Sequence, residues 1–392
     1  MNPFEQVPLA DLRERTSIKW RFFEPDVLPM WVAEMDVLPA EPIVEAVHAA
    51  MLRGDTGYPH GLGYAEAFGR FADDRWGAAV DVARTALVSD VMMGAFELIR
   101  SLTPPGGSVI VTSPVYPPFH AYSQHAERQV VEAPLGADLR LDLEAVEEAC
   151  RRVGAAQGQP GAVLLLCNPH NPTGTVHTRA ELESLAEITA RHGVRVISDE
   201  VHAPLLFDAT FTPYWSVDPR GFSLTSASKA FNLAGLRTAL IVGGAATAAD
   251  LAGIAEVVSH GPSHIASIAH IAAFDDGRPW LDAVLGGLRE NRALLARLLE
   301  EHAPSIRWRP GEATFLAWLD CRGTRAADPE ATADAGYIGL STGPAKHFLE
   351  HARVGLSAGE AFGTGGENHV RFNLGTRPDL IEEAVRRMGA VA

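Results

Sequence analysis

The chain has 392 residues, of which 47% are hydrophobic and 21% are charged, and its formal net charge is −16. At roughly 100–200 residues per domain, this length predicts two or three domains with a large packed core, and the composition argues against global disorder. The acidic balance argues against nucleic acid and an anionic membrane surface as partners, because both attract basic protein surfaces.

The sequence predicts a cytoplasmic protein with no metal site. The N-terminal stretch carries no signal-peptide pattern, and no apolar run approaches the ~18 residues of a membrane-spanning helix. Cys150, Cys167 and Cys321 are far apart and form neither a CxxC pair nor a metal-ligand spacing. So few, widely spaced cysteines are typical of a reducing compartment.

The pattern of the chain changes after the first 47 residues, which carry many prolines and predict an N-terminal arm. From about residue 84, short apolar runs alternate with helical stretches. Strands are expected at 85–89, 108–113, 129–135, 162–167 and 194–198, and helices at 93–102, 118–126, 143–153 and 178–193. Thr178 and Glu181 have the spacing of a capping box, and Gly193 stands where the last of these helices should end.

Apolar strands that alternate with helices predict an α/β fold, with a mostly parallel sheet covered by helices on both faces. A connecting helix is expected at 278–302, and short strands and two helices follow it. We therefore predict an arm at residues 1–47 that packs with the small domain, a large domain at 48–283 and a smaller α+β domain at 284–392.

Ligands of such sheets bind at the carboxyl ends of the strands, so the segments that follow the strands should meet at one edge. These segments are 90–93, 113–118, 168–174, 199–202 and 226–229. The last of them ends at Lys229, a single lysine among small hydroxyl residues. It is either a solvated loop lysine or a lysine whose amine forms a Schiff base with a carbonyl.

Four further residues at this edge have both an ordinary and a functional interpretation. Asp199 is a helix cap or ion-pair partner, or it stabilises a positive charge on a ligand heterocycle. Asn171 is a turn residue, or it holds a ligand oxygen. Tyr116 packs in the core or lies over a planar ligand, and Arg237 forms a surface ion pair or binds a phosphate.

The segment 90–93 opens a helix, and its free backbone amides form an anion site. Ser226 and Arg237 complete a cup for a phosphate. A phosphate, a protonatable ring nitrogen, a ring oxygen and an aldehyde are together the groups of pyridoxal phosphate, and each has a candidate partner here. Each residue alone is a weak signal, but the ordered set predicts this cofactor.

The motifs NPHNPTG, SDEVH and SASKAFNLAGLR, in that order, resemble the fold-type I aminotransferase superfamily, and the resemblance covers essentially the whole chain. The stretches RTSIKW, LPMWVAEMD and SKAFNLAGL are similar to the cystathionine β-lyase group of C–S lyases, of the MalY/PatB type. The resemblance implies the fold-type I fold, with a large domain on a mostly parallel seven-stranded sheet and a smaller α+β domain. Two departures are Glu34, where that group usually has aspartate, and the stretch SDVMM, which lacks a glycine common in aminotransferases.

The resemblance also implies a role for each matching residue. Lys229 binds the cofactor and then acts as the catalytic base, with Asp199 on the ring nitrogen and Tyr116 stacked on the ring. The implied substrate contacts are Arg371, which grips the α-carboxylate, Asn171 and Ala33. The other implied cofactor contacts are Val91, Met92, Asn171, His202, Ser226, Ser228, Arg237 and, across a homodimer, Tyr58.

The expected reaction is α,β-elimination of an amino-acid substrate, cystathionine or a related cysteine S-conjugate, which releases a thiol, pyruvate and ammonia. The alternative is an aminotransferase of an L-amino acid, because both reactions share one carbanion. A transcription regulator of this fold is disfavoured, since no helix-turn-helix pattern stands in the first 50 residues. A nicotinamide-dependent dehydrogenase is disfavoured too, because no GxGxxG follows an early strand.

Overall fold

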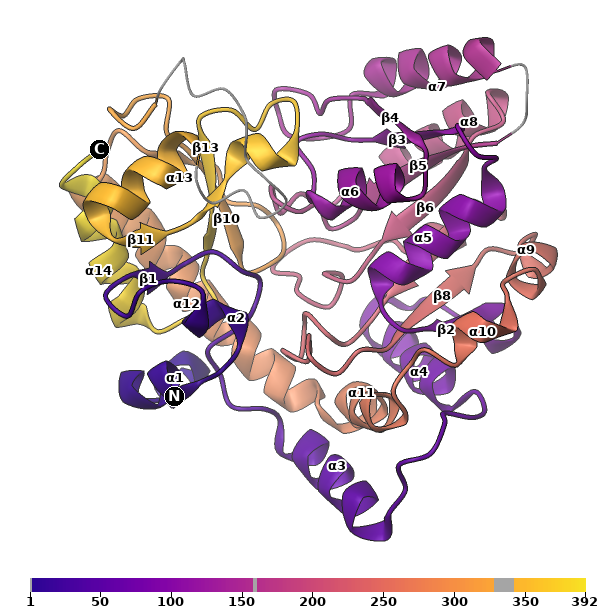
Figure 1. Cartoon of the computed structure of the whole chain (residues 1–392), viewed down its shortest axis with the longest axis horizontal. Coiled ribbons are helices and arrows are strands. Elements are labelled where there is room, and N and C mark those ends of the chain that lie inside the picture. The colour runs from indigo at the N-terminus through magenta and orange to yellow at the C-terminus, as the bar shows by residue number, and fades with distance from the viewer. Residues whose placement is uncertain (1, 158–160, 328–341) are drawn as a thin grey trace.

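The largest sheet of the molecule confirms the predicted, mostly parallel architecture. In the computed structural model, which describes residues 2–157, 161–327 and 342–392, seven strands form it in the order β2-β8-β7-β6-β5-β3-β4 (Figure 1). Strand β8 is antiparallel to both of its neighbours, and the other pairs are parallel. The strands are β2 (Thr85–Val88), β3 (Ser108–Val111), β4 (Gln129–Glu132), β5 (Ala162–Cys167), β6 (Arg195–Asp199), β7 (Phe222–Thr225) and β8 (Ala239–Gly243).

Helices cover both faces of this sheet. Along β3, Val109 and Val111 pack with one group of helices and Ile110 with the other, because strand side chains alternate between the two faces. The first group is α5 (Val91–Leu102) and α6 (Pro118–His125), and the second is α7 (Leu143–Gln157) and α8 (Arg179–Arg191). Helix α8 begins at the predicted capping box of Thr178 and Glu181, so that prediction is confirmed.

The reversed direction of β8 brings the residues that precede it to the edge of the sheet where ligands are expected. Because it runs against β7, its first residues lie where the neighbouring strands end. Arg237 and Thr238, just before β8, therefore stand beside Ser226, just after β7. The Ser226 hydroxyl donates a hydrogen bond to the Thr238 carbonyl oxygen at 2.8 Å, which fixes the two segments together.

A second, smaller sheet of four strands has the order β12-β13-β10-β9. The N-terminal segment lies beside it, since β1 (Leu28–Pro29) pairs in parallel with β11 (Val354–Gly355) (Figure 1). Val7, Leu12 and Met30 share a buried apolar cluster with side chains of the small sheet, of α14 and of the end of α12. The elements here are α1 (Leu9–Glu14), α2 (Ile18–Arg21), β9 (Arg307–Trp308), β10 (Leu316–Asp320), β12 (Ser357–Ala358), β13 (His369–Asn373), α13 (Gly343–His347) and α14 (Pro378–Gly389).

Helix α12 (Arg278–His302) matches the predicted connecting helix and joins the two cores. Leu281 and Leu288 pack in a cluster with α4 and α11, whereas Leu295 and Leu299 pack with the small sheet. The proposed boundary between residues 283 and 284 falls inside this helix, and the domain limits stay a prediction. The remaining helices are α3 (Glu41–Arg53), α4 (Gly63–Trp76), α9 (Ala248–Ala252), α10 (Glu256–Ser259) and α11 (His264–Asp276). Among the described residues, no helix has both the length and the apolar character that crossing a bilayer requires.

Candidate active site

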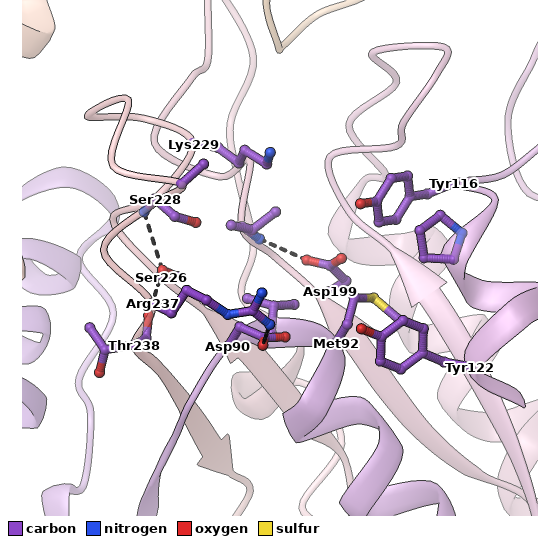
Figure 2. Close-up of a pocket in the computed structure, with 14 residues that line it drawn as sticks. Asp90, Met92, Tyr116, Tyr122, Asp199, Ser226, Ser228, Lys229, Arg237 and Thr238 are labelled. Atoms are coloured by element: carbon purple, nitrogen blue, oxygen red, sulfur yellow. Dashed lines mark hydrogen bonds and ion pairs between the residues drawn. The ribbon is translucent and has the colours of Figure 1, made fainter. Parts of the chain in front are cut away.

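A pocket of about 260 Å³ lies at the predicted edge of the large sheet (Figure 2). Lys229, Ser226 and Arg237 stand on one side of it, and Tyr116 stands on the opposite side. Eight of the residues proposed from the sequence line this pocket: Val91, Met92, Tyr116, Asp199, Ser226, Ser228, Lys229 and Arg237. Residues from at least four separate segments of the sequence are therefore brought together.

Lys229 follows β7 on a short turn, and its amine points toward the N-terminal segment. The Nζ atom donates a hydrogen bond to the Ala33 carbonyl oxygen at 3.2 Å. Burial, and then the charge of Arg371, lower the pKa of Lys229 to about 8, while the carboxylates of Glu34 and Asp199 act in the opposite direction. A fraction of the amine is therefore neutral near pH 7, which a nucleophile or base requires.

Asp199 is the last residue of β6 and lines the pocket. One of its carboxylate oxygens accepts a hydrogen bond from the Val201 amide at 3.1 Å. Burial raises the pKa of Asp199 to about 6, although this hydrogen bond and the charge of Lys229 lower it. A cationic ring nitrogen placed against Asp199 would supply a further positive charge in direct contact and favour the ionised carboxylate.

The first turn of α5 forms one wall of the pocket and presents free amides. Asp90 caps this helix, and its Oδ1 accepts a hydrogen bond from the Met93 amide at 2.9 Å. The amides of Val91 and Met92, which come before Met93, have no partner inside the helix. They are therefore available to an anion, with the favourable end of the helix dipole behind them.

Arg237 lies beside this helix start and forms an ion pair with Asp90. The Asp90 carboxylate raises the pKa of Arg237, whose side chain is 61% exposed. The ordinary interpretation of Arg237 as an ion-pair residue thus holds in the structure. Its position beside the free amides also leaves it close to any phosphate that they bind.

Arg371 and Asn171 are hydrogen-bonded to each other, although they lie 200 positions apart in the sequence. The Nη1 atom of Arg371 donates to Asn171 Oδ1 at 3.0 Å, and Nη2 donates to the Trp31 carbonyl oxygen at 3.1 Å and to Ser357 Oγ at 3.3 Å. Burial lowers the pKa of Arg371 to about 10, so the guanidinium remains charged at neutral pH. Its Nε atom is buried without a hydrogen-bond partner in the described part of the chain.

His202 is buried close to the same charges, three residues after Asp199. Burial, and then the charges of Lys229 and Arg371, lower the pKa of His202 to about 3. Its ring packs edge-to-face against Phe315, and its Nδ1 atom is buried without a hydrogen-bond partner among the described residues. The imidazole is therefore neutral at physiological pH and has a ring nitrogen available for a ligand oxygen.

Five of the proposed residues do not line this pocket: Ala33, Asn171, His202, Arg371 and Tyr58. Of these, Tyr58 lines a different pocket. Its side chain is 81% exposed, and it lines a separate surface pocket with His260, whose ring lies edge-on at 6.2 Å. Within a single chain, Tyr58 therefore does not line the pocket that holds Lys229.

The sequence interpretation missed three polar residues that line the pocket: Asp90, Tyr122 and Thr238. Asp90 carried a signal, since an aspartate three residues before Met93 is a typical helix cap. The ion pair between Asp90 and Arg237 gave no signal in the sequence, because it depends on the reversed direction of β8. Tyr122 lies four residues after Pro118, which also lines the pocket, so the two share one face of α6.

The residues present fit pyridoxal phosphate. An amine with a lowered pKa, a buried carboxylate, free helix amides beside an arginine and a neutral histidine each match one group of that molecule. The buried Nδ1 of His202 and Nε of Arg371, which lack partners in the described chain, indicate that ligand atoms complete the site.

Comparisons with known proteins agree with this geometry. Residues 27–388 match the family described as "Aminotransferase class I and II". A Mycobacterium leprae protein named "Putative cystathionine beta-lyase" is 52% identical over 393 residues, which cover 99% of this chain and 98% of that protein. A protein of Corynebacterium glutamicum named "Cystathionine beta-lyase" is 31% identical over 389 residues, which cover 98% of each chain.

The fold comparison gives the same result. A solved structure of a "putative plp-dependent beta-cystathionase" from Corynebacterium diphtheriae superposes with a TM-score of 0.86 at 30% identity, and the match covers 98% of both chains. The chain therefore belongs to the aminotransferase class I and II family. The fold-type I architecture predicted from the motifs is confirmed.

Proposed function

We propose that this chain is a pyridoxal-phosphate-dependent C–S β-lyase that converts cystathionine, or a related cysteine S-conjugate, and water into a thiol, pyruvate and ammonia. The observation that carries the proposal is the amine of Lys229, which has a lowered pKa and lines one pocket with the start of α5 and Arg237, while the charge of the buried Arg371 acts on it. The names of the relatives at 52% and 31% identity support the carbon–sulfur bond as the one that breaks.

The residues of the chain divide the chemistry between them. Bound pyridoxal phosphate would supply an aldehyde for the substrate amine and a ring that withdraws electrons from the α-carbon. Lys229 Nζ takes the α-proton, since its pKa of about 8 leaves part of the amine neutral. Asp199 offsets the positive charge of the ring nitrogen, and Arg371 binds the α-carboxylate of the substrate.

The other residues hold the cofactor in place. The amides of Val91 and Met92 and the guanidinium of Arg237 bind the phosphate. Tyr116, opposite Lys229 in Figure 2, would pack on the ring. Asn171 and His202 bind the ring oxygen, and Ser226 and Ser228 shape the turn, since the Ser228 amide donates to Ser226 Oγ at 3.2 Å.

We also propose that the chain acts as a homodimer in the cytoplasm. Tyr58 stands on the surface, so it can reach a partner subunit rather than its own pocket. Large apolar side chains are exposed on α3, just before it and at the start of α4: Leu38, Val44, Met51, Leu52 and Leu62. Apolar side chains grouped on a surface are typical of an interface between proteins. The three cysteines are buried and unpaired, which fits a reducing compartment.

The test of the proposed reaction is pyruvate release from L-cystathionine by the purified protein with pyridoxal phosphate and without any keto acid. We expect pyruvate and free thiol over many turnovers, and a loss of roughly 10⁴-fold or more in Lys229→Ala. Lys346→Ala is the matched control, because Lys346 lies on α13 and does not line the pocket. Turnover that requires an added keto acid would instead identify an aminotransferase.

A further inference from the structure

The segment 31–36 lies between Lys229 and Arg371 and is hydrogen-bonded to both. Lys229 Nζ donates to the Ala33 carbonyl oxygen at 3.2 Å, and Arg371 Nη2 donates to the Trp31 carbonyl oxygen at 3.1 Å. These two carbonyl groups are only two residues apart. The position of the segment is therefore linked to the positions of the reactive amine and of the guanidinium proposed to bind the substrate.

Asn232 holds this segment from the side of Lys229. Its Oδ1 accepts a hydrogen bond from the Met35 amide at 2.7 Å, and its Nδ2 donates to the Met35 carbonyl oxygen at 2.8 Å. The two bonds join parts of the chain that are 197 residues apart in sequence. Since Asn232 lies three residues after Lys229, it connects the lysine turn directly to the segment.

Asn373 holds the same segment from the side of Arg371. Its Nδ2 donates to the carbonyl oxygens of Val32 at 2.6 Å and Glu34 at 2.7 Å. It lies two residues after Arg371 on β13. The segment is thus held between two asparagine side chains, each a near neighbour of one of the two functional residues.

The backbone conformation of Asn232 separates two explanations for an asparagine at this position. Its φ is +56°, and it ends a helical turn in which the Leu233 amide donates to the Ser228 carbonyl oxygen at 2.8 Å. Glycine suits such a left-handed position best, and asparagine comes after it. The turn alone would therefore accept glycine, whereas the two hydrogen bonds to Met35 require the side chain.

We propose that Asn232 is a positioning residue, whose side-chain amide fixes the segment 31–36 and thereby keeps the Ala33 carbonyl next to the Lys229 amine and the Trp31 carbonyl next to Arg371. The inference rests on the proposed function, because it takes Lys229 and Arg371 as the reacting and binding groups. In this role, Asn232 contacts neither substrate nor cofactor. It acts through the segment 31–36 on Lys229 and Arg371.

The test is Asn232→Gly, with Asn368→Gly as the matched control. Asn368 also has a left-handed backbone, with a φ of +59°, and its side chain makes no hydrogen bond to the described residues. In the holoenzyme, we expect hydrogen exchange of the peptide that covers residues 31–36 to become about tenfold faster in Asn232→Gly only. We also expect kcat/KM of Asn232→Gly to fall about tenfold, a factor that corresponds to the loss of one or two net hydrogen bonds. The Tm of this variant should change little.

The exchange measurement keeps this inference separate from the proposed reaction, because it is made without substrate. Unchanged exchange in Asn232→Gly would overturn the positioning role, whichever reaction the enzyme catalyses. An equal effect in Asn368→Gly would also overturn it, since the glycine itself would then be the cause. Asn232→Asp keeps the acceptor for the Met35 amide, and its exchange and kcat/KM should lie between those of the parent and of Asn232→Gly.

Discussion

The two arginines proposed to bind anions, Arg237 and Arg371, are placed in opposite environments. The Arg237 side chain is 61% exposed and is already paired with the carboxylate of Asp90. Arg371 is 6% exposed, and its hydrogen bonds go to a carbonyl, an amide oxygen and a hydroxyl. No carboxylate in the described part of the chain lies within ion-pair distance of Arg371.

Before an anion binds, the charge of Arg237 is already balanced by Asp90. The charge of Arg371 has no paired carboxylate among the described residues. A buried charge without a counter-ion is costly. An anion that binds to Arg371 provides this missing counter-ion, so its electrostatic attraction to the guanidinium should be strong. An anion that reaches Arg237 must compete with Asp90 and with solvent, where such interactions are weak. The buried end of the site, at Arg371, should therefore discriminate between substrates. The exposed end, at Arg237, should mainly retain a phosphate together with the α5 amides.

Of the two arginines, Arg371 should show the larger effect when it is replaced by alanine. We expect kcat/KM for L-cystathionine to fall by roughly 10²- to 10³-fold, because truncation removes a buried, charged donor of hydrogen bonds. The amount of bound pyridoxal phosphate, measured by its absorbance after gel filtration, should stay close to that of the parent. Cofactor loss as large as the loss of kcat/KM would contradict the carboxylate role.

Arg237→Ala should have a smaller effect than Arg371→Ala, and it should affect the binding of pyridoxal phosphate rather than of the substrate. We expect pyridoxal phosphate to bind roughly 10- to 100-fold more weakly, because one charge-assisted contact to the phosphate is lost while the helix amides remain. At saturating cofactor, the KM for substrate should change little. Since the site is exposed, high salt should weaken cofactor binding in the parent more than in the variant. A raised KM with unchanged cofactor affinity would reverse the assignment of the two arginines.

Local sequence patterns predicted the elements that build the exposed end of the site. Strand β7, the turn to Lys229 and the start of α5 each follow from an apolar run and from the residues that end it. The reversal of β8 did not follow from such patterns, because a buried antiparallel strand is as apolar as a parallel one. The ion pair of Arg237 with Asp90 depends on that reversal, because the reversal brings the residues before β8 to the edge where β7 ends.

The buried end was harder to predict, because it is built by contacts between distant segments. Arg371 and its partners Trp31, Asn171 and Ser357 come from three regions of the chain, and only a family resemblance indicated Arg371. Asn232 gave no functional signal, since an asparagine at the end of a turn is common. Its role depends on Met35, and such pairings are set by packing rather than by local sequence.

Asp90→Asn sharpens the contrast between the two arginines by freeing Arg237. Asparagine still accepts the hydrogen bond from the Met93 amide, so α5 keeps its cap. The negative charge that competes with a phosphate is removed. We expect pyridoxal phosphate to bind a few-fold more tightly, which a titration of the apoenzyme followed by absorbance would measure. Weaker binding would show that Asp90 supports the phosphate site rather than competing with it.

The smallest expected effect is a shift in the pH dependence of cofactor capture by the apoenzyme. Only the neutral amine of Lys229 reacts with an aldehyde, and its pKa is about 8, so the capture rate should rise with pH and level off above about pH 8. The charge of Arg371 is one cause of that lowered pKa, whereas Arg237 is not among the causes. Arg371→Ala should therefore move the midpoint to higher pH, and Arg237→Ala should leave it in place. Stopped-flow absorbance at saturating cofactor measures the midpoint, and equal shifts in both variants would mean that the two arginines act on Lys229 alike.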